Sequence, residues 1–486
     1  MALLQVVLFL MMCAVALGWV ARHFKFPYPI ALVIGGAALG FVPRLPQLQF
    51  DPQFLLVLVL PPILYQAALL TSWHELKANI RPIGLLAIGL VIATTLAVGA
   101  TLKLLIPDIP WSAAFVLGAI VSPPDVAAAT AILSRVNIPR NVVTVLEGES
   151  LVNDASGLVI YKFAVAAVLT GAFSLWQASL EFVGVAVGGV VIGLLMGRLF
   201  VFIHRYLGDA FIEVLTTLAV PYVAYIFAES LHVSGVLAVV AAGIVRGRYS
   251  PEIVSAEMRI IARSVWNLLV FLLNTLIFIL IGVQLSGIVA RLSDYSVGEL
   301  FFYGTFVSAV AIFVRFAWVY PATYLPLVAR AMLGEQVALP REGEVFIIGW
   351  CGMRGIVSLA AALALPQTLE DGNAFPERDL IIFLTFVVIA VTLVLQGLTL
   401  KPLIRRLKVG RDWSLQEEQQ RAQMALGKAA IAAIDAVAAE DGIPNELAER
   451  IRAEFAEKIT LFSRNTSRFH TERAMMRISA ETISGA

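Results

Sequence analysis

The chain is short of charged residues and of cysteine, and each shortage excludes a class of protein. Only 14% of its 486 residues are charged, whereas a soluble protein of this length would carry roughly a quarter. Its two cysteines, Cys13 and Cys351, both lie in apolar segments, so they indicate neither a disulfide framework nor a zinc site. The sequence has no P-loop, dinucleotide fingerprint or nucleophile elbow, so we expect no cofactor and no enzymatic activity. A formal net charge of +1 gives no indication of a nucleic-acid partner.

What the chain has in abundance is long apolar runs. Hydrophobic residues make up 59% of it. They fall into blocks of about 20 residues, the length that crosses a hydrocarbon core of roughly 30 Å. We therefore predict an all-α polytopic membrane protein with about thirteen transmembrane helices. The predicted spans lie near residues 3–20, 28–43, 54–71, 82–106, 111–135, 142–169, 178–203, 211–229, 232–247, 264–287, 299–323, 345–366 and 379–400.

Basic residues predict the orientation of these spans. The first span could also be a cleaved signal peptide, but no basic residue precedes it, while Arg22 and Lys25 follow it. That order favours a retained helix with its N-terminus outside. Later basic residues lie mostly in odd-numbered loops, which the positive-inside rule places in the cytoplasm. We expect a multi-pass protein of the cell membrane with a cytoplasmic C-terminus.

Past about residue 409 the composition becomes polar and rich in Ala, Gln and Glu. We predict two domains, a transmembrane domain over residues 1–408 and a helical cytosolic tail over residues 409–486. One tail helix is expected from Ser414 to Ala438, with Ser414 as its N-cap, and a second near residues 446–463. We interpret the tail as a solvated appendage, with a regulatory or dimerising module as the alternative.

Five charged residues fall near the centres of predicted spans, where each costs roughly 2.5–3.5 kcal/mol on insertion scales. They are Asp125, Glu149, Asp154, Arg315 and Arg354. Charges at that depth must pair, take up a proton or line water. These residues are therefore the candidates for function.

The fifth span contains Ser122-Pro-Pro-Asp125. Two successive prolines lack N–H groups and clash with the preceding turn, which predicts a break near the centre of this helix. Carbonyls freed at membrane depth are tolerated only where they face protein or a water-filled cavity. Beside the Asp125 carboxylate, such carbonyls suit a cation. The alternative is a simple proline kink with a snorkelling Asp125.

On the sixth span, helical spacing places Glu149 beside Asn153 and Ser150 beside Asp154. Ser150 and Asp154 can present oxygens to one ion, and a carboxylate that binds either a proton or a cation is the minimal device for exchange. We expect Glu149 to pair with an arginine, for which Arg315 of the eleventh span is available. The alternative is that Asn153 and Asp154 only form hydrogen bonds between helices.

The twelfth span carries three glycines around an arginine, in Gly349-Trp-Cys-Gly352-Met-Arg354-Gly355. They weaken this helix at its centre. Spans five and twelve would then be broken helices in corresponding positions of two halves, which is typical of an inverted-repeat transporter with its site at the midplane. We predict that spans 1–6 and 8–13 form the two repeats and that the broken helices cross.

Four motifs together resemble the cation:proton antiporter-1 family, which includes bacterial NhaP-type antiporters and animal sodium/proton exchangers. The resemblance covers residues 3–405 and implies a core domain that moves against a dimerisation domain, in a homodimer. The motifs are Pro61-Pro-Ile-Leu64, Ser122-Pro-Pro-Asp125, Leu146-Glu-Gly-Glu-Ser-Leu-Val-Asn-Asp154 and Gly352-Met-Arg-Gly355.

The resemblance implies that Asp154 is the shared site of proton and cation, with Asn153 beside it. An Asn-Asp pair at this place is typical of electroneutral members. Asp125 matches the acidic residue of the broken fifth helix, and Ser150 matches a hydroxyl that coordinates the cation. Many members have Asp-Pro in the fifth helix, whereas Pro124 here leaves only a backbone carbonyl as a ligand at that position.

Glu149 with Arg315 matches a structural ion pair of the family, and Arg354 matches a required arginine of the twelfth helix. We therefore expect a secondary antiporter that exchanges one monovalent cation for one proton, in pH and sodium homeostasis. Na+ is the first candidate, with Li+ and K+ as alternatives, because residue types do not fix the dimensions of the cavity. The alternative function is a cation channel or an ion-gated membrane sensor without stoichiometric exchange.

Overall fold

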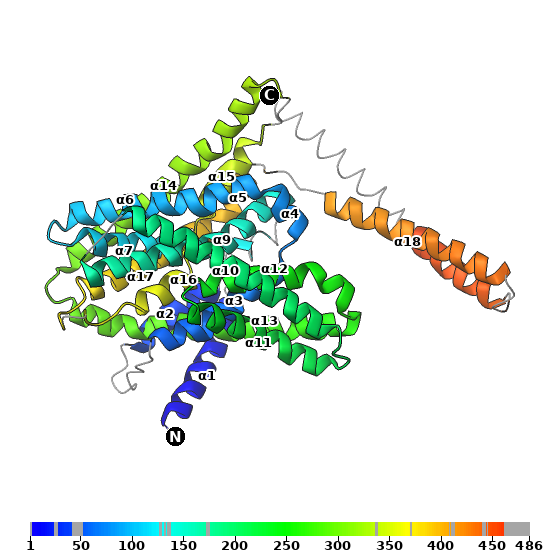
Figure 1. Cartoon of the computed structure of the whole chain (residues 1–486), viewed down its shortest axis with the longest axis horizontal. Coiled ribbons are helices and arrows are strands. Elements are labelled where there is room, and N and C mark those ends of the chain that lie inside the picture. The colour runs from blue at the N-terminus through cyan, green and yellow to red at the C-terminus, as the bar shows by residue number, and fades with distance from the viewer. Residues whose placement is uncertain are drawn as a thin grey trace. The chain divides into compact units, whose positions relative to one another are not determined.

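The computed structural model describes a helical protein (Figure 1). Apart from one isolated bridge between Thr368 and Ala374, the described residues contain no β-structure. The prediction of an all-α membrane fold is confirmed. The described residues are 2–23, 28–40, 52–125, 129–130, 133, 138–171, 175–335, 339–369, 372–407, 409, 414–439, 444 and 446–460.

Residues 1–136 with 141–409 form one compact unit, in which the helices pack as two bundles. The first bundle consists of α1 (Ala2–His23), α2 (Tyr28–Gly40), α3 (Pro52–Leu70), α10 (Leu175–His204), α11 (Ala210–Ser230), α12 (Gly235–Ile253) and α13 (Ala256–Arg291). The second bundle consists of α5 (Ile80–Gly84), the π-helix η1 (Leu85–Leu90), α6 (Val91–Leu105), α7 (Trp111–Val121), α9 (Arg140–Thr170), α14 (Val297–Met332), α15 (Glu342–Trp350), α16 (Ile356–Leu363) and α17 (Arg378–Arg406). A short helix, α4 (Trp73–Ala78), leads into α5.

The other compact unit consists of residues 137–140 and 410–486. Its long helix α18 (Ser414–Ala439) packs against a helix over residues 446–460, with Gly427 facing Ile459. Arg452 Nη2 lies 2.5 Å from Asp435 Oδ1 and ties the two helices together. The expected helix pair of the tail is therefore present over the described residues.

Each predicted span coincides with one described helix or with helical pieces on either side of an interruption. Eight helices are long and apolar enough to cross a membrane, and four shorter apolar helices accompany them. One of the eight, Arg421–Ala439, lies in the tail that the sequence predicts to be cytosolic, and alanine supplies most of its apolar character. The count of thirteen spans and the crossing of the broken helices stay predictions.

Polar side chains mark where several helices begin. Asp209, Ser234, Ser255 and Ser296 each accept a hydrogen bond from a backbone N–H in the first turn of α11, α12, α13 and α14. Such caps satisfy donors that have no partner within the helix. At α14 the Glu299 side chain also accepts from the Ser296 N–H, which completes a capping box.

Helix α3 continues through Pro61 and Pro62, although consecutive prolines disrupt a helix. Pro62 has no N–H for the carbonyl of Leu58, four residues earlier. The Tyr222 hydroxyl, on α11, donates to that carbonyl instead at 2.9 Å. A side chain from a neighbouring helix therefore takes the place of the missing backbone donor.

We predict that Tyr222→Phe lowers the free energy of unfolding by about 1 kcal/mol, because the Leu58 carbonyl loses the hydroxyl that replaces its missing backbone donor. Denaturant unfolding of the purified protein in detergent measures this change. Tyr206→Phe is the matched control, since Tyr206 is 76% exposed. Equal stability of the two variants would show that Tyr222 does not support α3.

Candidate functional site

Two helices of the second bundle are interrupted, and their interruptions contact each other. Helix α7 ends at Val121, and the chain is non-helical over residues 122–125. Helices α15 and α16 are separated by the non-helical residues 351–355. The Asp125 N–H donates to the carbonyl oxygen of Met353 at 2.6 Å. Both breaks that the sequence predicts are present, and a backbone hydrogen bond joins them.

Arg354, in the second break, binds carbonyls rather than a carboxylate. Its Nε donates to the Val121 carbonyl at 2.9 Å and its Nη2 to the Ala311 carbonyl at 3.2 Å, while its Nη1 donates to the Gly352 carbonyl. Its backbone N–H donates to the Thr392 hydroxyl at 3.1 Å. The guanidinium therefore caps the end of α7, where a positive charge compensates the negative end of the helix dipole.

Asp125, in the first break, lies against the start of α16. A Cβ atom added to Gly355 would overlap the Asp125 carboxylate, so only glycine permits this approach. The carboxylate consequently sits beside the positive end of the α16 dipole. Arg354 of the second break thus places a positive charge at the C-terminal end of α7. Asp125 of the first break places a negative charge at the N-terminal end of α16.

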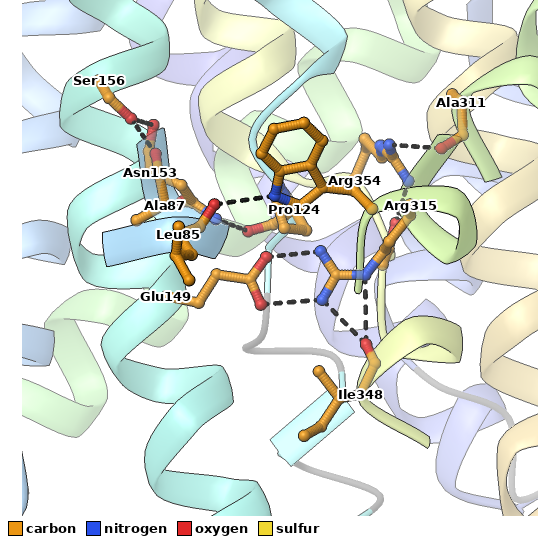
Figure 2. A network of polar contacts seen from close by, with 12 residues as sticks. Leu85, Ala87, Pro124, Glu149, Asn153, Ser156, Ala311, Arg315, Ile348 and Arg354 are labelled. Atoms are coloured by element: carbon orange, nitrogen blue, oxygen red, sulfur yellow. Dashed lines mark hydrogen bonds and ion pairs between the residues drawn. The ribbon is translucent and has the colours of Figure 1, made fainter. Parts of the chain in front are cut away.

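Glu149 and Arg315 form a bidentate ion pair at the centre of the bundle (Figure 2). Arg315 Nη1 lies 2.5 Å from Glu149 Oε1, and Nη2 lies 2.9 Å from Oε2. The Ile348 carbonyl accepts the two remaining contacts of the guanidinium, at 3.2 and 3.0 Å. Both side chains are at most 1% exposed. This pair is fully engaged, so neither partner is left to bind a transported ion.

Asn153 and Asp154 lie on α9 opposite the first break. Asn153 is fully buried; its Nδ2 donates to the Pro124 carbonyl at 3.3 Å, while its Oδ1 has no hydrogen-bond partner. Asp154 is 8% exposed, and within the described part of the chain no donor reaches its carboxylate. The half-buried Ser150 hydroxyl likewise has no partner there. Asp125 acts on Asp154 as a neighbouring like charge, and a proton or a cation beside them relieves the repulsion.

The π-helix η1 supports this part of α9 and was not foreseen from the sequence. The Ser156 hydroxyl donates to the Ala87 carbonyl at 2.5 Å (Figure 2). Trp318 Nε1 donates to the Leu85 carbonyl at 3.0 Å. A π-helix leaves backbone groups misaligned, and side chains then satisfy them. The signal for Ser156 was its polarity within an apolar span, whereas nothing in the residue types indicated η1.

The five charged residues near the centres of the predicted spans differ in their partners. Arg315 neutralises Glu149, Arg354 is held by carbonyls, and Asp125 faces a helix N-terminus. Asp154 is the one among them with neither a counter-charge nor a donor in the described residues. A carboxylate in this setting can hold a proton or a monovalent cation, with the Asn153 and Ser150 oxygens as further ligands.

Comparison with known proteins gives consistent results. The family described as "Sodium/hydrogen exchanger, transmembrane" matches residues 7–406. An uncharacterised Na+/H+ exchanger of Mycobacterium tuberculosis is 36% identical over 461 residues, which cover 94% of this chain and 84% of that protein. The sodium, potassium, lithium and rubidium/H+ antiporter of Bacillus pumilus is 36% identical over 81% of this chain and 61% of its own length.

Among solved structures, the sodium proton antiporter MjNhaP1 of Methanocaldococcus jannaschii has a similar fold. The TM-score is 0.66, and the match covers 84% of this chain and 99% of that one. At 20% sequence identity the likeness concerns the fold alone. The helical architecture of the membrane part is therefore that of a known antiporter.

We predict that Glu149→Ala lowers the free energy of unfolding by about 3–5 kcal/mol, because it leaves the Arg315 guanidinium buried without a counter-charge. Thermal or denaturant unfolding in detergent measures the loss. The double variant Glu149→Leu with Arg315→Met should recover part of it, since no buried charge then remains. An unchanged melting curve together with a weaker apparent cation affinity would instead make Glu149 a ligand.

We predict that Gly355→Ala impairs transport strongly, because its methyl group would displace the Asp125 carboxylate from the start of α16. The control is Gly184→Ala on α10, where an added methyl group meets no atom within 4 Å. Exchange in liposomes is compared at equal amounts of folded protein. Wild-type rates in Gly355→Ala would show that the contact between Asp125 and α16 is dispensable.

Proposed function

The chain belongs to the sodium/hydrogen exchanger family, and from this premise we propose that Asp154 is the carboxylate that binds the proton and the cation in turn. The protein is a multi-pass membrane protein that exchanges a monovalent cation for protons. The observation that carries the assignment is the contrast between Asp154, which no donor among the described residues reaches, and the paired Glu149 on the same helix.

The contrast matters because exchange requires mutually exclusive binding. A carboxylate that already accepts strong hydrogen bonds or faces an arginine is stabilised as an anion and takes up a proton poorly. In the part of the chain that the structure describes, the buried Asp154 lacks such partners, so either a proton or a cation can compensate its charge. When one ligand must leave before the other binds, each transport cycle carries one of each, in opposite directions.

The remaining ligands come from four neighbours. The Asn153 Oδ1 is a buried acceptor without a partner, which costs free energy unless a cation or water uses it. Ser150 adds a hydroxyl one helical turn before Asp154, and Asp125 adds a second carboxylate from the first break. The Pro124 carbonyl accepts from Asn153 and keeps a second lone pair for the cation.

We further propose that exchange is electroneutral, with one cation for one proton, and that Na+ is transported, with Li+ and K+ as further candidates. The Bacillus pumilus relative is named as an antiporter of all three of these ions. A homodimer, an outside N-terminus and a cytoplasmic tail complete the proposal. The channel or sensor alternative has no observation in its favour.

We predict that Asp154→Asn abolishes exchange, while its stability is unchanged or higher because no hydrogen bond to this carboxylate is lost. The assay uses purified protein in liposomes with an acidic interior and a pH-sensitive dye, to which Na+, Li+ or K+ is added outside. Asp108→Asn is the control, since it makes the same change on an exposed loop residue.

Repeating the assay with the membrane potential clamped at several values tests stoichiometry. Alkalinisation that depends on the cation and is indifferent to the potential supports one-for-one exchange. Normal transport by Asp154→Asn would refute the assignment of this residue. Cation flux that needs no opposing proton gradient would support the channel alternative.

A further inference from the structure

Gln396, in the second half of α17, has a fully buried side-chain amide. It is 0% exposed, and within the described residues neither its Nε2 nor its Oε1 takes part in a hydrogen bond. Each buried donor or acceptor without a partner lowers the stability of the fold. Such groups are rare in folded proteins, and an amide that leaves both of them unsatisfied requires a reason other than packing.

Gln396 faces the second break, which separates α15 from α16. Thr392, one turn before Gln396, accepts a hydrogen bond from the Arg354 N–H at 3.1 Å. Thr399, three residues after Gln396, accepts one from Trp350 Nε1 at 3.0 Å. Residues spaced by four and three positions share one face of a helix. The second break therefore runs antiparallel to this face of α17, and Gln396 lies opposite it, between the two hydroxyls.

Two backbone groups of the second break are not satisfied by its contacts with α7. Within the described residues, the Cys351 carbonyl accepts no hydrogen bond and the Met353 N–H donates none. Met353 lies beside the same part of α17, since a Cβ atom added to Gly397 would be 3.7 Å from its Sδ. The Gln396 amide offers donors and an acceptor, which match this carbonyl and this N–H. The amide and the break are therefore complementary, although they are not paired in the described structure.

Met353 also connects the second break to the candidate site. Its carbonyl accepts a hydrogen bond from the Asp125 N–H at 2.6 Å. A cation bound between Asp125 and Asp154 draws the two carboxylates together, because it removes the repulsion between them. The hydrogen bond to Met353 transmits this displacement to the second break, where a small rotation of the backbone brings the Met353 N–H to the Gln396 Oε1.

We propose that Gln396 is a positioning residue of the transport cycle, whose amide binds the Cys351 carbonyl and the Met353 N–H when the cation occupies the site. These hydrogen bonds fix the second break and, through Met353, the position of Asp125. The cost of the unpaired amide in one state is offset by its use in the other. Gln396 contacts neither the cation nor the proton. This inference rests on the proposed function of Asp154.

The test compares Gln396→Met with the wild type, because methionine is similar in length and has no amide. Gln396→Met should raise the apparent KM for Na+ on the order of tenfold at an unchanged maximal rate, which is the loss expected for two net hydrogen bonds. Exchange is measured in liposomes, with choline chloride keeping the ionic strength constant. Gln396→Asn keeps donors and an acceptor on a shorter side chain, so its KM should lie between the two.

Thermal unfolding in detergent distinguishes this role from a purely structural one. Without Na+, Gln396→Met should unfold at the temperature of the wild type or above it, since the variant loses an unsatisfied buried amide. The same concentration of Na+ should then stabilise the wild type more than Gln396→Met, because only the wild type gains the two hydrogen bonds on binding.

Thr385→Val is the control on the same helix. Thr385 is as buried as Gln396, but its hydroxyl donates to the Ile381 carbonyl of its own helix at 2.8 Å. This variant should keep the KM and the response to Na+ of the wild type. A lower unfolding temperature of Gln396→Met without Na+, or an unchanged KM and an unchanged response to Na+, would overturn the proposal.

Failure of this inference is distinguishable from failure of the proposed function. Asp154→Asn is assayed in the same vesicles. If Asp154→Asn is inactive and Gln396→Met behaves as the wild type, only the role of Gln396 is refuted. If Asp154→Asn transports normally, the assignment of the site itself is refuted.

Discussion

Backbone groups freed at membrane depth have no water to bind and must find partners inside the protein, and the rest of this site depends on that constraint. The break after α7 and the break between α15 and α16 satisfy each other: Arg354 donates to carbonyls of both, and the Asp125 N–H donates to Met353. Two segments more than 200 residues apart in the chain are therefore held together. The hydrogen bond from Asn153 to the Pro124 carbonyl attaches α9 to them.

Helix α9 carries two buried carboxylates that differ in their partners. Glu149 is buried against Arg315 with every oxygen engaged, while Asp154, five residues later, is reached by no donor in the described chain. Removing a partner from a buried ion pair is costly, so Glu149 and Arg315 are held together as a structural pair. The unpaired carboxylate is the one whose charge can be compensated by different ligands at different times. The partners of a carboxylate, rather than its residue type, thus distinguish a carboxylate with a structural role from one that can bind a proton and a cation in turn.

The sequence predicted the parts of this site that follow from local chemistry. Proline and glycine revealed the two breaks, and the cost of charge in an apolar span revealed the five ionisable residues. The partners of Arg354 were not predictable, because a backbone carbonyl has no signature in the sequence. Pro61-Pro62 shows the same limit, since the dipeptide that ends α7 is tolerated within α3 where the Tyr222 hydroxyl replaces the missing donor. Tertiary contacts decide whether such a pair breaks a helix.

The polar contacts within the second bundle differ from those between the two bundles. Within the second bundle, the links are buried and hold backbone carbonyls, so separating its helices would expose groups that nothing else can satisfy. Between the bundles, Lys162–Glu229 and Arg291–Asp379 are partly exposed ion pairs, each worth about 0–1 kcal/mol. These polar links between the bundles are therefore weaker than the buried links within the second bundle, and an apolar core shared by both bundles, with Leu64 of α3 and Val357 of α16 among its members, accompanies them. A site held rigidly inside one bundle keeps its ligands together, and an exchanger needs such a site to present the same carboxylate to each side of the membrane in turn.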